Sequence, residues 1–316
     1  MRILITGGFG FVGGRLAVHL AQAGRQIVLG SRNSITPPAW LPQAEVVQIE
    51  WDDGRALEHS CNGADAVIQA AGMNAQECAS DPIAALAFNG VATARLVAAA
   101  SRAGVQRFIY LSTAHVYASP LVGTITEDTC PRNLHPYSSS HHAGESAVLS
   151  ASQRGRIEGI VLRLSNAFGA PVHEDVNCWT LLVNDLCRQA VTKRSFTLRS
   201  AGVQRRDFVT LQDVSRAVSH VLDLSKEHMG DGIFNIGGAW TPRVIDMAEL
   251  IRERCSAVLG FVPDFIRTEP DEGEAALDLD FQINRLLASG FGLSGNAATE
   301  IDATLLFCHE AFGSDR

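Results

Sequence analysis

A glycine-rich stretch near the N-terminus is the first pattern in this sequence that could do chemistry. It reads Thr6-Gly7-Gly8-Phe9-Gly10-Phe11-Val12-Gly13, and the registers Gly8-x-Gly10-x-x-Gly13 and Gly7-x-x-Gly10-x-x-Gly13 both fit a phosphate-binding turn. Each register predicts a tight turn whose backbone N–H groups approach a pyrophosphate at the positive end of a helix. A strand-like run precedes the glycines and a helical pattern follows them. That context favours a dinucleotide site over an ordinary glycine turn.

The end of the second expected strand indicates which dinucleotide is preferred. An NAD site usually carries a carboxylate there, which holds the ribose 2'-hydroxyl. This sequence has Gly30-Ser31-Arg32-Asn33 instead, without an acidic residue. Arg32 and Ser31 can pair with a 2'-phosphate through charge-assisted hydrogen bonds, so we expect NADP to be favoured over NAD. The alternative is that Arg32 is a solvated surface arginine.

The glycine loop must be positioned by a layered fold. Across the first 165 residues, short apolar runs alternate with stretches of helical periodicity. The runs lie at 3–6, 26–29, 46–49, 66–69, 107–112 and 159–163, and the helical stretches at 11–23, 55–61, 82–103 and 136–153. This alternation predicts an α/β fold, a Rossmann-type doubly wound parallel sheet with helices on both faces.

After residue 163 the alternation loosens. We expect a helix at about 175–191, a strand at 206–210, a helix at 211–224, a strand-like run at 232–236, a helix at 242–259 and two helix-like stretches in the polar tail. This pattern predicts a dinucleotide-binding domain formed by residues 1–165 plus about 205–235. A smaller C-terminal substrate-binding lobe would comprise 166–204 plus 236–316.

The composition excludes several classes of protein. Hydrophobic residues make up 46% of the chain, charged residues 19%, and the net charge is −8, which fits a folded core and no general attraction for nucleic acid or an anionic membrane. The seven cysteines are widely spaced, without a C-x-x-C pair or a zinc-binding pattern. We find no apolar run of about 18 residues and no signal peptide. We therefore expect a cytoplasmic protein with reduced thiols and no metal.

Further motifs occur along nearly the whole chain. They are ADAVIQAAG at 64–72, LSTAHVY at 111–117, Tyr137 at the start of a helical stretch, LRLSN at 162–166, RRDFV at 205–209 and FNIGG at 234–238. Together with the glycine loop, they resemble the extended short-chain dehydrogenase/reductases, specifically the nucleotide-sugar epimerase/dehydratase family. The resemblance is specific for the family but does not identify a substrate.

The resemblance implies roles for individual residues. Thr113 matches the catalytic Ser/Thr that hydrogen-bonds the substrate oxygen. Tyr137 matches the tyrosine that exchanges a proton with a sugar hydroxyl or ketone while hydride moves at the nicotinamide. Implied cofactor contacts are Gly7, Gly8, Phe9, Gly10, Phe11, Val12, Gly13, Ser31, Arg32, Asn33, Glu50, Trp51, Ala70, Ala71, Gly72, Asn89, Ser112, Tyr137 and His141. Implied substrate contacts are Met73, Asn74, Asn166 and Arg206, the last two at the nucleotide-diphosphate part.

The family's Tyr-x-x-x-Lys motif is altered, because Tyr137-Ser138-Ser139-Ser140-His141 has histidine at the lysine position. The spacing still stacks the two side chains on one helix face. In the family, the lysine binds the nicotinamide ribose, and its charge favours the tyrosinate. His141 can keep the first role, but it carries a charge only when protonated, and its unperturbed pKa is about 6.5. We therefore expect ketosugar reduction, in which Tyr137 starts with its proton, to be favoured over epimerisation.

Dehydration is not expected. Sugar 4,6-dehydratases resemble Ser-Thr-Asp-Glu-Val-Tyr after the fifth strand, whereas this chain has Ala114 and His115 in place of the two acids. His115 reads as a loop histidine. Farther on, Arg267 precedes an acidic stretch in a register displaced from the family's phosphate-binding arginine, which departs from an ordinary nucleotide-sugar pocket.

The leading interpretation is an NAD(P)-dependent oxidoreductase acting on a nucleotide-activated sugar, as ketosugar reductase or epimerase. A short-chain dehydrogenase acting on a non-sugar ketone or alcohol is the first alternative, since one fold hosts many substrates. A catalytically impaired nucleotide-binding protein, acting as a redox sensor or scaffold, is the second. By resemblance we also expect a homodimer through the helices at 82–103 and 136–153.

Overall fold

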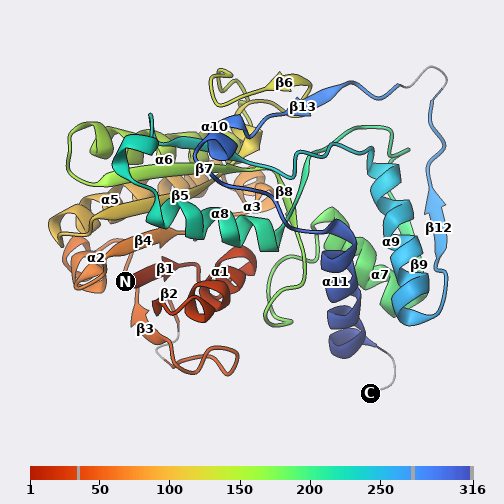
Figure 1. The fold of residues 1–316 in the computed structure, drawn as a ribbon, viewed down its shortest axis with the longest axis horizontal. Helices are drawn as coiled ribbons and strands as arrows, with labels where there is room; N and C mark the ends of the chain where they lie inside the picture. The colour runs from red at the N-terminus through yellow and green to blue at the C-terminus, as the bar shows by residue number, and fades with distance from the viewer. Residues whose placement is uncertain (34–35, 272–274, 314–316) are drawn as a thin grey trace.

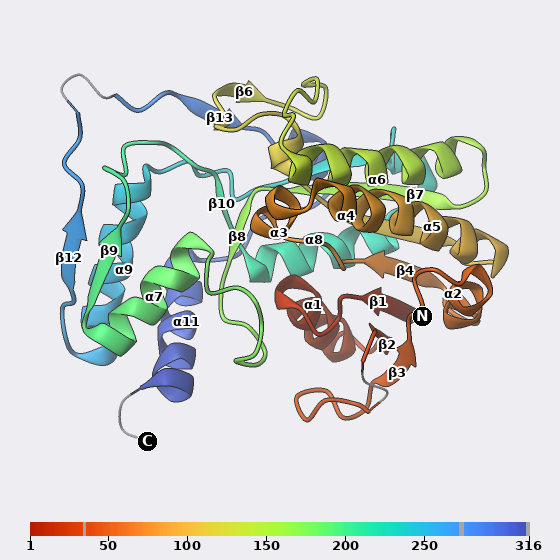
Figure 2. The same ribbon diagram turned by 180° about the vertical axis from the view of Figure 1, so that it is seen from behind.

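The computed structural model describes residues 1–33, 36–271 and 275–313. In this part of the chain, seven strands form one parallel sheet in the order β11-β7-β5-β4-β1-β2-β3 (Figures 1 and 2). The strands are β1 (Arg2–Thr6), β2 (Gln26–Ser31), β3 (Glu45–Gln48), β4 (Ala66–Gln69), β5 (Arg107–Thr113), β7 (Glu158–Leu164) and β11 (Ile233–Ile236). The predicted fold class, a Rossmann-type doubly wound sheet, is confirmed.

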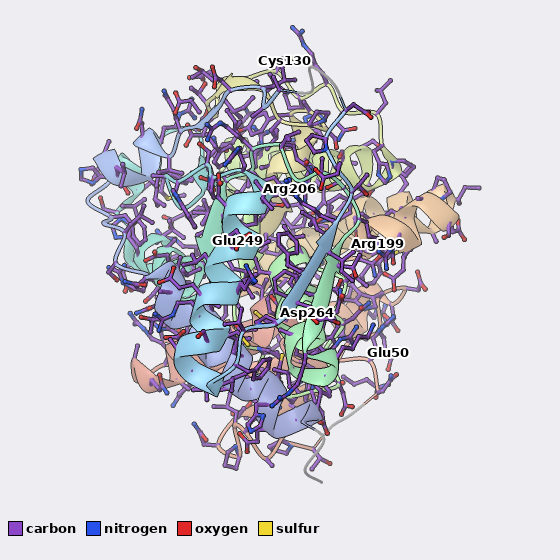
Figure 3. The ribbon with its side chains drawn as sticks, turned by 90° about the vertical axis from the view of Figure 1, so that its right-hand side faces the viewer. Glu50, Cys130, Arg199, Arg206, Glu249 and Asp264 are labelled. Atoms are coloured by element: carbon purple, nitrogen blue, oxygen red, sulfur yellow. The ribbon has the colours of Figure 1, made fainter. Side chains whose placement is uncertain are left out.

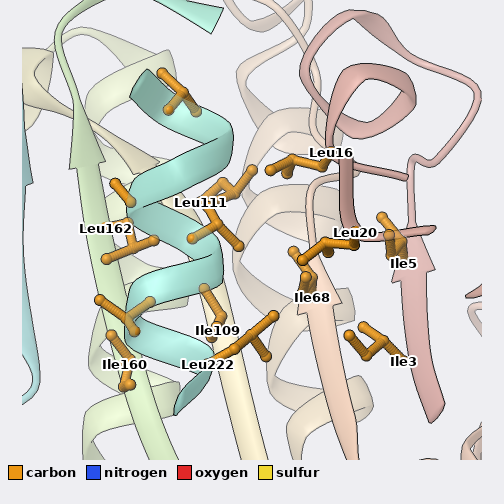
Figure 4. Packing of buried hydrophobic residues seen from close by; sticks show 14 of the residues in the cluster. Ile3, Ile5, Leu16, Leu20, Ile68, Ile109, Leu111, Ile160, Leu162 and Leu222 are labelled. Atoms are coloured by element: carbon orange, nitrogen blue, oxygen red, sulfur yellow. The ribbon is translucent and has the colours of Figure 1, made fainter. Parts of the chain in front are cut away.

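Alternate residues of each strand face opposite layers of helices, as a doubly covered sheet requires. Ile3 and Ile5 of β1 belong to a buried cluster with α1 (Phe11–Gln22) and α8 (Leu211–Asp223), shown in Figure 4. Leu4 belongs to the cluster on the other face. That cluster includes residues of α2 (Gly54–Cys61), α5 (Thr93–Arg102) and α6 (Pro136–Gln153).

The chain reverses its direction of winding between β1 and β4, which are hydrogen-bonded neighbours. The segments that leave the carboxyl ends of these two strands must diverge, one to each face of the sheet. Ligands of doubly wound sheets bind in the crevice at such a switch point. The glycine loop follows β1 and the Ala70–Gly72 segment follows β4, so both lie at this crevice.

Several of the remaining elements lie together beyond one end of the sheet (Figures 1 and 2), namely α7 (Leu182–Lys193), α9 (Val244–Leu259), α11 (Ala297–Phe312) and the strands β9 (Ser195–Leu198) and β12 (Asp264–Arg267). A separate buried cluster joins α7, α9 and α11. Parallel two-stranded pairs are β8 (Asn166–Phe168) with β10 (Phe208–Thr210), β9 with β12, and β6 (Gly123–Ile125) with β13 (Leu279–Phe281). Short helices are α10 (Asn284–Ala288) and the 3₁₀ turns η2 (Ala114–Val116) and η3 (Lys226–His228). The domain division at residue 165 stays a prediction.

The long helix expected at 82–103 is composite. It runs as α4 (Pro82–Ala85), a π-helix η1 (Leu86–Ala92) and α5, and a separate helix α3 (Ala75–Ser80) precedes it. The helix expected at 175–191 begins only at Leu182, because the preceding residues form turns in which the Trp179 indole donates to the Glu174 carbonyl. Hydrophobic periodicity does not register such local hydrogen bonds.

The expectation that no apolar segment is long enough to span a membrane was wrong. The continuous helical stretch Pro82–Arg102 passes that test by length and composition, with a mean hydropathy of 1.6 over an 18-residue window. Half of that window is buried inside the protein, as in a core helix, so the test is weak evidence for a membrane segment.

Candidate functional site

In the part of the chain that the structure describes, two adjoining cavities open at the carboxyl edge of the sheet. The larger measures about 440 Å³ and the smaller about 320 Å³, and both are lined by Ala70 and Gly72. Of the predicted site residues, the larger is also lined by Phe11, Val12, Met73, Asn74, Ser112, Thr113, Tyr137, His141, Asn166 and Arg206. The smaller is also lined by Gly7, Phe9, Gly10, Ser31, Arg32, Asn33, Trp51 and Ala71. Residues far apart in the sequence therefore meet at the switch point.

The glycine loop has the geometry that a pyrophosphate needs. Gly7 has φ +67°, and a Cβ there would lie 2.6 Å from the backbone nitrogen of Ala71. Gly13 packs so close to the Gly7 carbonyl that any side chain would collide with it. Helix α1 begins after Gly10 without a side-chain cap or an acidic residue in its first turn, so its first N–H groups are available to an anion. Gly8 and Gly13 contribute packing rather than cavity lining.

Arg32 lines the smaller cavity, and no acidic side chain is among the described residues of that lining. The backbone N–H of Asn33 donates to Ser31 Oγ over 3.2 Å, which shapes the turn after β2. Within residues 1–33, 36–271 and 275–313, Arg32 has no ion pair. Trp51 Nε1 is buried there without a hydrogen-bond partner among the described residues, which leaves a donor for a bound base. Glu50 is exposed, lies outside both linings, and is seen at the molecular edge in Figure 3.

Thr113 and Tyr137 meet in the larger cavity although they come from different elements. Thr113 ends β5, where its Oγ1 accepts a hydrogen bond from the His115 N–H over 3.1 Å, and Tyr137 is the second residue of α6. Burial raises the pKa of the Tyr137 phenol, although its hydrogen bond with Thr113 acts in the opposite direction. The phenol is therefore protonated at neutral pH, and it can donate a proton to an oxygen that Thr113 also binds.

His141 lies one helical turn beyond Tyr137, with the two ring centroids 4.6 Å apart. The imidazole is buried, and the Tyr110 hydroxyl lies 2.9 Å from its Nδ1. Burial lowers the pKa of His141 to about 4. The histidine is therefore neutral at pH 7 and does not supply the positive charge that a lysine would bring to this place.

A buried hydrogen-bond network that the sequence did not predict lies next to the end of strand β5. Ser112 Oγ donates to Glu145 Oε1 over 2.6 Å, and Glu145 forms a 2.7 Å ion pair with Arg163. Arg163 also donates to the Tyr117 hydroxyl, which in turn donates to Asn235. The network joins β5, α6, β7 and β11. The only sequence signal for Glu145 is its position two turns after Tyr137 on the inward helix face.

Asn166 begins strand β8, and Arg206 lies two residues before strand β10, which pairs with β8. The Arg206 backbone N–H donates to the Pro242 carbonyl over 3.1 Å, which holds it near the start of α9 (Figure 3). Burial lowers the pKa of its guanidinium, and no carboxylate within the described residues pairs with it. Asn166 Nδ2 is engaged with the Asp207 carbonyl at 2.8 Å. Arg206 is therefore a cation that lines the cavity and has no ion-pair partner in the described part of the chain.

Asn89, Met73 and Asn74 support the cavity wall. Asn89 is buried in the π-helix, where its Oδ1 accepts from the Met73 N–H over 2.9 Å and its Nδ2 donates to Ser140 Oγ over 3.0 Å. Asn74 caps α3 by accepting from the N–H groups of Gln76 and Glu77. Asn89 lies outside both linings, so its contacts show a supporting role for the loop after β4.

His115 lies within the candidate site and Arg267 lies outside it. His115 lines the larger cavity, and its pKa is lowered by burial and by the charge of Arg206. It is therefore a neutral imidazole that lines the candidate site from the short turn η2. Arg267 lies outside that lining and donates to the Ala201 carbonyl over 3.1 Å.

Comparison with known proteins agrees with this fold. The sequence model described as the NAD dependent epimerase/dehydratase family matches residues 3–237. A putative UDP-glucose 4-epimerase of Methanocaldococcus jannaschii is 25% identical over 280 residues, covering 86% of this chain and 87% of that protein. A dTDP-6-deoxy-L-talose 4-dehydrogenase (NAD(P)(+)) of Kitasatospora kifunensis is 28% identical over 264 residues, covering 80% and 78%.

Among solved structures, MoeE5 in complex with UDP-glucose and NAD superimposes with a TM-score of 0.79. The alignment covers 99% of this chain and 100% of that one, at 22% sequence identity. At this identity the likeness shows the fold. The family follows from the sequence match, which spans more than half of the chain.

Proposed function

Because this chain belongs to the NAD-dependent epimerase/dehydratase family, we propose that it is a reductase of nucleotide-activated ketosugars, with Tyr137 as the proton donor. The observation that carries the proposal is the buried, neutral His141 at the position where the family has lysine. A nicotinamide cofactor supplies the hydride when it is bound between the two cavities. The residues of this chain bind and orient the ketone and deliver the proton.

The direction of reaction follows from the protonation state of Tyr137. To act as a base near pH 7, a phenol must have its pKa lowered from about 10, which needs roughly 4 kcal/mol of preferential stabilisation of the anion. Here burial raises the pKa of Tyr137, and the neighbouring His141 carries no charge to offset it. The protonated phenol is already suited to reduction. Oxidation of an alcohol, the first half of epimerisation, lacks this stabilisation.

The reductive step needs a hydride, which a bound nicotinamide would supply, and a proton, which the Tyr137 phenol carries. Hydride adds to the carbonyl carbon, and the proton of Tyr137 passes to the carbonyl oxygen, which Thr113 positions through its hydroxyl. A ketone, a reduced nicotinamide and one proton thus give an alcohol and an oxidised nicotinamide. Water from the open cavity then returns a proton to Tyr137.

A nucleotide-diphosphate group on the substrate is supported by Arg206. Its guanidinium faces the larger cavity, which Tyr137 and Thr113 also line, and it has no carboxylate partner among the described residues. A partly buried cation without a partner is costly, and a phosphate satisfies it through two parallel hydrogen bonds. The proposed substrate therefore spans from Arg206 to Tyr137.

For the cofactor, we propose NADP in preference to NAD. The support is Arg32, which has no ion pair with any described residue, together with the absence of an acidic side chain from the described lining of the smaller cavity. The structural neighbour MoeE5 binds NAD, so the preference rests on Arg32 of this chain alone.

One observation favours an alternative substrate class. The lining of the larger cavity is rich in apolar side chains, including Leu111, Leu164, Phe168, Leu182 and Phe208. Such a wall suits a non-sugar ketone or alcohol, because it buries apolar substrate surface. The neutral His141 also suits a protein that binds nucleotide without turnover, which is the second alternative.

We propose a homodimer and a cytoplasmic location as well. Ile83, Leu86 and Val91 are exposed on the α4–η1 face, with Ile83 83% accessible, and an apolar face of this kind suits a second copy of the chain. The free cysteines suit a reducing compartment.

The experiment that tests the proposed function follows NADPH absorbance with UDP- and dTDP-linked 4-ketosugars, with non-sugar ketones as a parallel panel. We expect ketosugar-dependent oxidation of NADPH and much slower epimerisation of UDP-glucose. Turnover of the non-sugar panel alone supports the first alternative. Cofactor binding without turnover on any substrate supports the second and contradicts the proposal.

A further inference from the structure

A hydrogen-bonded chain of buried side chains leads from the sheet core to His141. Its members are Gln69 of β4, Thr93 of α5 and Tyr110 of β5, which are 0%, 0% and 1% exposed. None of the three lines either cavity. Tyr110 contacts His141, which lines the larger cavity, so these residues can act on the candidate site through His141.

The amide of Gln69 sets the direction of donation in this chain. Its Nε2 lies 3.3 Å from the Ala71 carbonyl oxygen and 3.3 Å from Thr93 Oγ1. A carbonyl oxygen only accepts hydrogen bonds, so the atom facing Ala71 must be the NH₂ nitrogen of the amide. That nitrogen donates its second proton to Thr93, and Thr93 accepts it.

The direction of hydrogen-bond donation at Gln69 affects the next two side chains, Thr93 and Tyr110. Burial raises the pKa of the Tyr110 phenol, and hydrogen bonding from Thr93 acts in the opposite direction, which is the effect of a hydroxyl that donates to Tyr110. Thr93 can donate in this way because it accepts from Gln69 and keeps its own proton. Tyr110 has one proton, and its oxygen lies 2.9 Å from His141 Nδ1 but 3.4 Å from the Asn89 carbonyl. The shorter contact is the stronger acceptor site for that proton. His141 Nδ1 is therefore an acceptor.

An imidazole that accepts at Nδ1 and is neutral carries its proton on Nε2. The Nε2 edge of the ring faces Gly72, where a Cβ would lie 3.7 Å from Nε2, and Gly72 lines both cavities. We propose that Gln69, Thr93 and Tyr110 are positioning residues that hold His141 as its Nε2–H tautomer, aimed at the junction of the two cavities. The tautomer is what allows a neutral histidine to replace one function of a lysine.

His141 replaces the hydrogen bond that a lysine would make, but not the positive charge of the lysine. An Nε2–H group at this junction donates one hydrogen bond to a ribose hydroxyl of a nicotinamide cofactor, as an ammonium would, but adds no positive charge beside Tyr137. This role rests on the proposed function. The opposite tautomer would present a lone pair at the junction, and the ribose would have to donate to it instead.

The direct test is ¹⁵N NMR of protein labelled at histidine, with His141 assigned from the signals lost in His141→Gln. At pH 7.5 we expect a protonated Nε2 and an unprotonated Nδ1 in the wild type. Tyr110→Phe removes only the donating hydroxyl, so both tautomers should become populated. Thr93→Val should shift the populations in the same direction but less, because Tyr110 remains.

Tyr117→Phe is the matched control. Tyr117 is an equally buried tyrosine whose hydroxyl contacts Asn235 and Arg163 and not His141. The Tyr117→Phe variant should be less stable than the wild type, but its His141 tautomer should stay unchanged. This result distinguishes a specific effect on the His141 tautomer from a general loss of stability. Thr93→Val serves as the second variant if Tyr110→Phe does not fold.

Cofactor affinity gives an independent readout. Loss of one neutral hydrogen bond should weaken NADPH binding by Tyr110→Phe about two- to ten-fold in a fluorescence titration, with little change for Tyr117→Phe. A wild-type proton on Nδ1, or an unchanged tautomer in both Tyr110→Phe and Thr93→Val, overturns the inference. If the wild type binds no NADPH, the proposed function fails, while the tautomer measurement still decides the positioning role.

Discussion

Glu145 of helix α6 and Arg163 of strand β7 form a buried ion pair, with side chains 1% and 4% exposed and 2.7 Å between Oε2 and Nη2. Both oxygens of Glu145 accept from Arg163, and one also accepts from Ser112, the residue before Thr113. The pair thus connects α6, which carries Tyr137, to the end of β5, which carries Thr113. The ion pair and its bond to Ser112 therefore tie helix α6 to strand β5 in the folded protein.

Glu145→Gln should lower the free energy of unfolding by about 3 kcal/mol or more, because Arg163 is left as a buried charge without a counter-ion. Urea denaturation followed by circular dichroism measures this. The matched control is Glu58→Gln, which breaks the half-exposed pair with Arg102 and should cost less than about 1 kcal/mol. Equal losses in the two variants would contradict the role assigned to the buried pair.

The pH dependence of stability should carry a contribution from His141. Its pKa is lowered to about 4 in the folded protein, against about 6.5 for an unperturbed histidine. Below pH 6.5 the unfolded chain therefore binds a proton that the folded chain rejects. This contribution is fully present above pH 6.5 and is lost as the pH falls towards 4, with a limit of about 3 kcal/mol.

Thermal melts of wild type and His141→Gln between pH 4 and 8 measure this difference. The variant should lose less stability on acidification. His142→Gln, at the exposed neighbouring position, should follow the wild type. Parallel acid profiles for wild type and His141→Gln would show that His141 is not buried in its neutral form.

Arg206→Ala should raise KM for the nucleotide-sugar substrate roughly 10- to 100-fold, because a charge-assisted phosphate contact is lost. The affinity for NADPH should not change, since Arg206 lines only the larger cavity. The control is Arg205→Ala, whose guanidinium donates to the Thr241 carbonyl and lies outside that lining. A KM effect of the same size in Arg205→Ala would remove the support for a diphosphate at Arg206.

Arg32→Ala should weaken NADPH binding roughly ten-fold or more while leaving NADH binding nearly unchanged, because the 2'-phosphate is the group that distinguishes the two. Fluorescence titration with both cofactors measures each affinity in the same protein. Wild-type protein that binds NADH as tightly as NADPH would contradict the proposed preference before any variant is made.

Ile83→Glu should convert the proposed dimer to a monomer in light scattering coupled to size exclusion, because a charge placed in an apolar interface remains unpaired. Val262→Glu is the control, since Val262 is also exposed but follows α9, far along the chain from the α4–η1 face. A wild-type protein that is monomeric at all concentrations would exclude the dimer.

Much of the fold could be predicted from the sequence because its signals are local. The glycine loop, the buried strands and the helix Pro136–Gln153 each rest on spacing within a few residues, and the structure has that helix at the expected bounds. The lysine-to-histidine change four residues after Tyr137 was equally visible. Each of these patterns depends on the side chains of one segment alone, so no distant contact was needed to see it.

What the sequence by itself determined is therefore the class of fold, the position of the glycine loop after the first strand, and which residues stand at the motif positions of the family. Only the tertiary structure decided their chemistry. The protonation state of His141 depends on burial and on Tyr110, which lies 31 positions earlier in the chain, and the pairing of Glu145 with Arg163 depends on the register of α6 against β7. Desolvation and hydrogen-bond polarity arise from contacts between distant segments, and these exist only once the chain has folded.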